Sequence, residues 1–95
     1  MSGAPVALSV WKYLLLIPAL PEIQDVLMPL GAEVLSVAGQ NEYPCLWARV
    51  DPEAELETRR FRVCETGAPG AEGEHVGTVL LYNGALVLHV FEASS

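Results

Sequence analysis

The dipeptide Asn83-Gly84 constrains the fold of this chain most strongly, because it separates two apolar runs at residues 76–82 and 85–91. Asparagine and glycine accept the positive φ angles of a two-residue type I′ turn, whose twist matches that of the strands it joins. The two runs are therefore predicted to form an antiparallel hairpin. Its register places four pairs of residues opposite each other: Tyr82 and Ala85, Leu80 and Val87, Thr78 and His89, and Val76 and Phe91.

Five further segments have the composition of strands and are bounded by turn residues, at residues 8–17, 21–28, 32–38, 44–51 and 58–66. Strands at this spacing are typical of antiparallel sandwiches and small barrels. One face of the hairpin is wholly apolar and is expected to lie on the core, at Val79, Leu81, Leu86, Leu88 and Val90. The sequence therefore predicts an all-β fold, a small antiparallel β-sandwich or barrel of about seven strands.

Three of these segments carry additional expectations. Residues 21–28 also fit one helical turn, and we prefer a strand because of the β-branched residues and the flanking prolines. Leu35 and Val37 are expected on one face of residues 32–38, with Val34 on the other. Residues 8–17 are mostly apolar on both faces, so the opposite sheet or a neighbouring subunit is expected to cover this strand. We expect a homo-oligomer, with this first strand as the candidate for self-association.

Length and charge limit the classes of function. The 95 residues predict a single domain at 1–95, with loose termini at 1–7 and 93–95 and a flexible loop at 67–73. The net charge of −7 argues against general binding to nucleic acid or to anionic membranes. The apolar run near the start is too short to span a membrane, so a cytoplasmic protein is expected.

No cofactor or metal is implied by the sequence. The two cysteines, Cys45 and Cys64, do not make a disulfide framework and are expected to be small buried apolar residues. His75 and His89 lie far apart in the chain, and no CxxC pair is present. His89 opposite Thr78 is interpreted as a cross-strand polar pair, because no acid is placed to orient the imidazole. Enzymatic activity is therefore not expected.

The cationic residues of this acidic chain are concentrated in one stretch, residues 40–67, which contains Trp47 and all four arginines: Arg49, Arg59, Arg60 and Arg62. Guanidinium groups that converge can bind phosphate, and an indole can stack on a base. Whether the strands at 44–51 and 58–66 present them on one side is left open by the sequence. The alternative is a set of surface ion pairs with the acidic residues of 51–57.

The turn before this cationic strand contains further candidates. Gln40 and Asn41 offer amide groups that can read the polar edge of a base, and Tyr43 offers an aromatic ring. The alternative is turn chemistry, with Asn41 in a left-handed conformation. The candidate ligand-binding residues are therefore Gln40, Asn41, Tyr43, Trp47, Arg49, Arg59, Arg60 and Arg62.

Four segments of the chain resemble a family of small proteins encoded by bacteriophages, prophages and actinobacterial genomes. They are WKYLL, MPLGAEVLSV, QNEYPCLWARVDPEAELETRRFRVCETGAP and VGTVLLYNGALVLHVFE, which together cover most of the chain. The combination of PCLWARVD and GALVLHVFE is the specific mark of this family. The resemblance carries no catalytic assignment.

Phage origin would favour an inhibitor of host defence. We therefore expect a non-catalytic binding protein that sequesters an anionic nucleotide second messenger at a site shared between subunits of a homo-oligomer. The alternative is a protein–protein interaction module, either an inhibitor of a host protein or a minor virion component, that uses its acidic surface.

Overall fold

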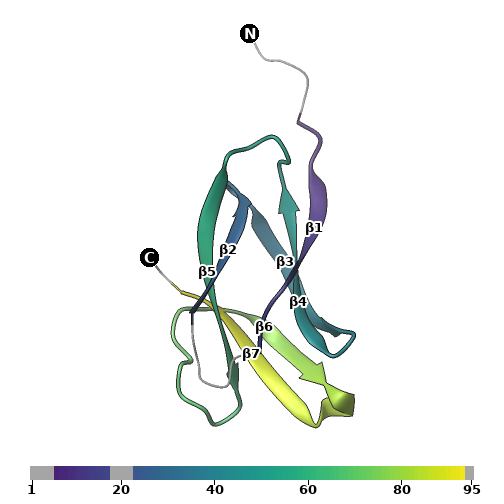
Figure 1. The fold of residues 1–95 in the computed structure, drawn as a ribbon, viewed down its shortest axis with the longest axis vertical. Helices are drawn as coiled ribbons and strands as arrows, with labels where there is room; N and C mark the ends of the chain where they lie inside the picture. Colours follow the sequence, from purple (N-terminus) through teal and green to yellow (C-terminus); the bar gives the residue numbers. More distant parts are fainter. Residues whose placement is uncertain (1–5, 18–22, 94–95) are drawn as a thin grey trace.

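A computed structural model describes residues 6–17 and 23–93 of the chain, and within these ranges it contains seven strands in two antiparallel sheets (Figure 1). The strands are β1 (Ser9–Leu14), β2 (Ile23–Pro29), β3 (Glu33–Gln40), β4 (Tyr43–Val50), β5 (Leu56–Glu65), β6 (Glu74–Leu81) and β7 (Leu86–Glu92). The three-stranded sheet has the order β1-β4-β3 and the four-stranded sheet has the order β2-β5-β7-β6. The predicted all-β sandwich is confirmed.

The core lies between the two sheets and takes alternate residues from each strand. In β4 these are Leu46, Ala48 and Val50, which are fully buried, and in β5 they are Phe61 and Val63. The hairpin face predicted to lie on the core does so, with Val79, Leu81, Leu88 and Val90 buried and Leu86 packed against them. Period-two alternation therefore identified the buried face of these strands correctly.

The ambiguous segment at residues 21–28 is resolved as a strand from Ile23 onward; its first two residues lie outside the described ranges. β2 pairs with the first part of β5, from Ile23 opposite Arg62 to Pro29 opposite Leu56. Gly31 follows in a turn with φ of 79°, which glycine adopts without steric cost. The preference for a strand over a helical turn is confirmed.

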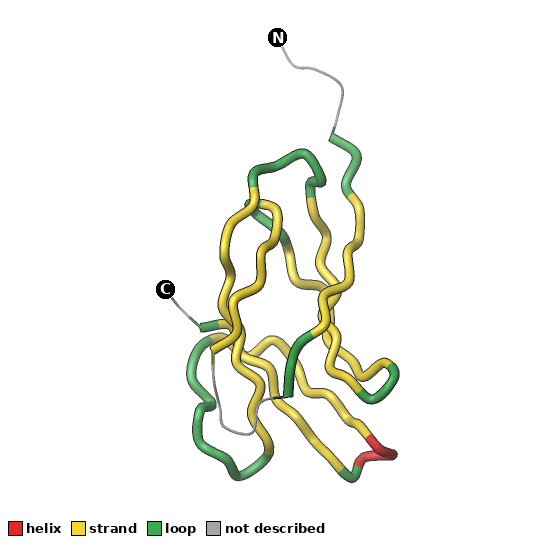
Figure 2. The backbone as a smooth tube through the Cα atoms, viewed as in Figure 1, coloured by secondary structure: helices red, strands yellow, loops and turns green. Residues whose placement is uncertain are grey.

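The Asn83-Gly84 turn has the expected conformation, with positive φ at both residues and a hydrogen bond from the N–H of Ala85 to the carbonyl oxygen of Tyr82 at 3.0 Å. Figure 2 shows the short helical turn, Tyr82–Gly84, at the tip of this hairpin. Tyr82 also has positive φ, and the strand pairing ends with Leu81 opposite Leu86. The predicted pairing of Tyr82 with Ala85 is therefore wrong, because both residues belong to the turn.

The register of the hairpin is as predicted for two of the four pairs, Leu80 with Val87 and Thr78 with His89. The predicted pairing of Val76 with Phe91 is wrong, because a bulge between His75 and Gly77 places His75 opposite Phe91. A second bulge lies between Val34 and Ser36 in β3. It puts Val34 and Val37 on the same, core-facing side, so the predicted separation of these two residues is also wrong.

The ends of the described chain differ in how they contact the sheets. Ala93, predicted to lie in a loose tail, donates its N–H to the carbonyl oxygen of Arg60 at 2.8 Å. The segment before β1 is described from Val6, which is exposed. No helix within residues 6–17 and 23–93 has the length and apolar character needed to cross a membrane.

Candidate functional site

The outward-facing side of the three-stranded sheet gathers half of the predicted ligand-binding residues. We call it the Trp47 face. Opposite residues in an antiparallel pair point to the same side, so the ladders of β4 with β1 and β3 define this face directly. It consists of Val10, Lys12 and Leu14 from β1, Tyr43, Cys45, Trp47 and Arg49 from β4, and Glu33, Ser36, Ala38 and Gln40 from β3.

The sequence of β4 explains why these side chains point outward. Its even-numbered residues from Pro44 to Val50 are buried, and its odd-numbered residues therefore project to the opposite side. Trp47 lies at the centre of the face, between Lys12 on β1 and Ser36 on β3. β4 is the middle strand, so it positions Trp47 with a neighbouring strand on each side.

Two polar contacts bracket the tryptophan. The ammonium group of Lys12 donates to Oε1 of Gln40 at 2.6 Å, which links the outer strands of the sheet across β4. Arg49 donates its Nε to Oε1 of Glu33 at 3.1 Å and forms an ion pair with it. Both side chains of this pair are at least half exposed, so solvent screens their attraction.

Three further residues of the Trp47 face are apolar and accessible, whereas Cys45 is buried. Val10 is 57% exposed, Leu14 is 55% exposed and Tyr43 is 50% exposed. The N-terminal strand contributes two of these three residues, together with Lys12. The face therefore combines aromatic rings, aliphatic side chains and one cation that has no acidic partner among the described residues.

The other three arginines belong to β5, in the opposite sheet. Arg60 and Arg62 share the outer face of the four-stranded sheet, because they alternate with the buried Phe61 and Val63. The core separates this face from the Trp47 face, so Arg49 does not converge with Arg60 or Arg62. The four arginines therefore do not form one site within a protomer. The strands at 44–51 and 58–66 do not present them on one side, which the sequence had left open.

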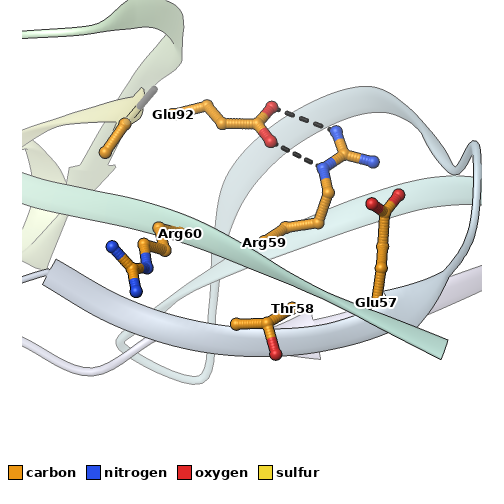
Figure 3. A pocket seen from close by; sticks show the side chains of 6 residues that line it. Glu57, Thr58, Arg59, Arg60 and Glu92 are labelled. Carbon is orange, nitrogen blue, oxygen red and sulfur yellow. Dashed lines mark hydrogen bonds and ion pairs between the residues drawn. The ribbon is translucent and has the colours of Figure 1, made fainter. Parts of the chain in front are cut away.

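Arg59 points to the inner side of β5, where Glu92 holds it. Its Nε and Nη2 donate to the two carboxylate oxygens of Glu92 at 2.6 and 3.0 Å, and its Nη1 donates to the carbonyl oxygen of Ala32 at 2.7 Å. Figure 3 shows the two side chains turned toward each other, while Arg60 extends away. The hydrogen bond with Glu92 raises the pKa of Arg59 above its usual value, and burial opposes this effect.

Arg60 and Arg62 also have acidic partners. Nε of Arg60 lies 3.6 Å from Oδ1 of Asp25, and Nη1 of Arg62 donates to Oε2 of Glu72 at 2.9 Å. Each of the four arginines therefore pairs with a carboxylate, as the alternative interpretation stated. The expected partners were the acids of residues 51–57, and the actual partners come from elsewhere in the chain.

The hollows beside Arg59 do not suit an anion. One has a volume of about 260 Å³ and includes Glu57, Arg59 and Glu92 in its wall. A neighbouring one of about 300 Å³ shares Arg59 and Glu92 and adds Glu33 and Glu74. The first wall also contains Arg60, so its carboxylates and guanidinium groups are equal in number, and Glu92 already binds Arg59. In the second wall carboxylates outnumber guanidinium groups three to one, so the local field there opposes a phosphate.

The remaining candidates have local structural roles. Asn41 has φ of 52° in the turn between β3 and β4, as the turn interpretation predicted. His89 lies between two hydroxyl groups, with Nδ1 at 3.2 Å from Oγ1 of Thr78 and Nε2 at 2.8 Å from Oγ1 of Thr66. The expected cross-strand pair is present, and Thr66 is a second partner that the sequence did not reveal.

The contribution of β1 to the Trp47 face was missed by sequence reasoning. The alternation of Val10, Lys12 and Leu14 with Trp11 and Tyr13 was visible in the sequence. The pairing of β1 with β4 was not, because it joins residues more than thirty positions apart and no short turn fixes its register.

Three comparisons with known proteins complete this description. Among curated proteins and among solved structures, no match was found. Within the described residues, no group of three or more histidine, cysteine, aspartate or glutamate side chains is arranged to hold a metal ion. The family described as Domain of unknown function (DUF7352) matches residues 7–95, and the chain belongs to this family.

Proposed function

We propose that this protein is a non-catalytic binding protein that holds a protein partner on the Trp47 face. The observation that carries the proposal is the grouping of Trp47, Tyr43 and Arg49 with exposed aliphatic residues on one side of a sheet. Tryptophan, tyrosine and arginine are the residues most enriched among those that dominate protein–protein binding energy. Contiguous exposed apolar surface on a small domain is also typical of interaction sites.

The shape of the surface favours a protein over a small ligand. Small-molecule sites are concave and bury most of the ligand, whereas the Trp47 face is the outer side of a sheet. The hollows described above lie around Arg59 and Glu92 instead, and neither has an excess of cationic groups in its wall. The proposed working surface is therefore aromatic and aliphatic, in place of the acidic surface expected from the sequence. The resemblance to phage-encoded proteins supports a host protein as the partner.

A second candidate function is sequestration of an anionic nucleotide second messenger, as an anti-defence protein would perform. The observation that favours it is that Trp47 lies opposite Lys12 and two residues from Arg49 on the same face of β4. An indole can stack on a base while the two cations contact phosphate. In this case the ligand would need a second surface to enclose it.

A comparison of wild type with two variants in a bacterial lysate tests the proposal. We expect immobilised wild type and Arg60→Ala, which changes the opposite face, to retain the same stoichiometric protein. Trp47→Ala should weaken its binding by at least about tenfold, since truncation of a central tryptophan typically costs about 2 kcal/mol or more. Circular dichroism checks that each variant is folded. Equal retention by all three proteins contradicts the proposed face.

The second candidate has its own readout. Cyclic dinucleotides and cyclic ADP-ribose isomers are added to wild type and to Trp47→Ala, and thermal unfolding is followed. A rise in Tm of the wild type that Trp47→Ala abolishes would favour nucleotide binding. We expect no rise for either protein.

A further inference from the structure

The open edge of β1 presents backbone groups in a position to pair with another strand. Leu15 donates its N–H to the carbonyl oxygen of Pro44 at 2.9 Å, so the odd-numbered residues of this segment face β4. Hydrogen bonding alternates along an antiparallel strand, so the N–H and C=O groups of Val10, Lys12 and Leu14 point away from β4. No other strand of the described chain pairs with this edge.

Leu16 confirms this direction. Its N–H donates to the side-chain oxygen of Gln24, and its C=O accepts from the side-chain nitrogen of Gln24, both at 2.7 Å. The amide of Gln24 thus occupies the place of a neighbouring strand at the end of the edge. Beyond it, the edge continues through Leu14, Lys12 and Val10.

The edge lacks the features that usually prevent strand association. Natural edges are protected by prolines, bulges or several charges. Within residues 6–17 the only charged residue is Lys12, although the protein has a net charge of −7. Leu8, Val10, Leu14 and Leu16 are each more than half exposed. Two copies can therefore approach along β1 without bringing acidic groups together.

We propose that β1 pairs antiparallel with β1 of a second copy, in a two-fold register centred on Trp11. This inference does not depend on the proposed partner. In this register the outward-pointing groups of Val10 meet those of the partner's Lys12, and Leu8 lies opposite the partner's Leu14. Trp11 lies opposite the partner's Trp11, and a cross-strand aromatic pair is favourable.

Other registers are less favourable. The backbone N–H and C=O groups that point away from β4 belong to even-numbered residues. Hydrogen bonds between the two copies therefore form only in registers that place an even-numbered residue opposite an even-numbered residue. A centre on Lys12 places two like charges opposite each other, which is destabilising. A centre on Val10 leaves Leu14 opposite Val6, outside the strand, and so shortens the ladder. The centre on Trp11 pairs Ser9 to Tyr13 within the two β1 strands, adds Leu14 opposite Leu8 directly before the strand, and avoids the contact between lysines.

This pairing joins the two three-stranded sheets into one sheet, with both Trp47 faces on the same side. Arg49 lies opposite Val10 across the protomer's own strands, and Val10 would lie opposite the partner's Lys12, which in turn lies opposite the partner's Trp47. The dimer therefore lengthens the Trp47 face and brings cations from both copies into its centre.

A proline substitution tests the pairing. Val10→Pro removes an N–H that points to solvent in the protomer, so the ladder with β4 is kept, and proline is tolerated at such edge positions. We expect wild type to have twice the protomer mass in native mass spectrometry and light scattering, and Val10→Pro to have the protomer mass. Val10→Thr keeps both the N–H and the β-branched shape and should remain dimeric. A wild type that is monomeric at all concentrations overturns the proposal.

A cysteine substitution tests the register. In the centred register, the Cα atoms of residue 11 in the two copies lie about 4.5 Å apart, within the range of a disulfide. The native Cys45 and Cys64 are buried. Trp11→Cys should form a covalent dimer under mild oxidation, whereas Ser9→Cys should not, because its two copies lie roughly 13 Å apart. A dimer in which Trp11→Cys does not crosslink, or in which Ser9→Cys does, overturns this register.

Discussion

Arg49 and Arg59 each form an ion pair, but in environments that give the two pairs different consequences. The side chains of Arg59 and Glu92 are 17% and 21% exposed, and Arg59 also bonds to a backbone carbonyl. Removing either partner leaves the other charge partly buried and unpaired, which destabilises the folded protein. This ion pair therefore has a structural role. Arg49 and Glu33 are at least half exposed, and such pairs contribute about 0–1 kcal/mol. A partner can therefore displace Glu33 at little cost.

Tyr13 provides a prediction about a single polar atom. Its ring packs against the core, and its hydroxyl group has no hydrogen-bond partner among the described residues. A buried hydroxyl without a partner is destabilising, so we expect Tyr13→Phe to raise the free energy of unfolding by about 1 kcal/mol. Urea denaturation at pH 7 measures this change. Tyr82→Phe, at an exposed tyrosine, serves as the control and should have no effect.

The same substitution has a pH dependence. Burial raises the pKa of Tyr13 above its usual value of 10.0, so the unfolded chain releases this proton first as pH rises. Stability from this group is complete below about pH 10 and is lost as pH rises through the folded pKa. The advantage of Tyr13→Phe over wild type should therefore grow between neutral pH and about pH 10.5. A constant difference would contradict the burial of the hydroxyl.

At the scale of elements, turns were predictable because their causes are local. Asn83-Gly84, Asn41 and Gly31 all have the positive φ that their residue types allowed one to expect. The bulges at Val76 and after Val34 were not predictable. A bulge depends on what opposes the extra residue, and the extra residue carries no signature of its own in a run of apolar side chains.

The candidate site was predictable to the extent that it depends on one strand. Alternation within β4 is enough to place Trp47 and Arg49 on one side, because they are two residues apart in the same strand. Alternation could not decide whether β5 presents its arginines beside those of β4, because the two strands are consecutive in sequence but belong to different sheets. Sheet membership is decided by contacts between distant residues, which composition and spacing do not record.

Gly73 supports a prediction about the junction between the 66–73 loop and β6. It has φ of 104°, and a Cβ at this position would lie against the carbonyl oxygen of Glu92, closer than real Cβ atoms come. Gly73→Ala combines the cost of positive φ with a clash against backbone. We expect it to lower the free energy of unfolding by about 2–4 kcal/mol, measured by urea denaturation.

Gly67 is the matched control at the other end of the same loop. Its φ of 86° is similarly positive, but a Cβ there would have no atom within 4 Å. Gly67→Ala should therefore cost only the backbone strain, about 1 kcal/mol. Equal losses of stability in the two variants would contradict the predicted clash between a Cβ at residue 73 and the backbone of Glu92.

At the scale of the whole molecule, the distribution of charge matters more than its sum. The net charge of −7 comes from a chain whose first described segment, residues 6–17, has no acidic residue. Repulsion between two copies is therefore weakest along β1, where the backbone edge is open. The same segment supplies Val10 and Leu14 to the Trp47 face, so association and partner binding involve adjoining surfaces.

The proposed dimer predicts that thermal stability depends on protein concentration. A species that binds only the folded state stabilises it by mass action, and here that species is a second folded copy. Above the dissociation constant, each tenfold rise in concentration should raise Tm of wild type by about 3 °C. Val10→Pro should unfold at the same temperature throughout, because it has lost the pairing edge. Scanning calorimetry over two decades of concentration makes the comparison, and a wild-type Tm that does not change would show that folding is complete within one protomer.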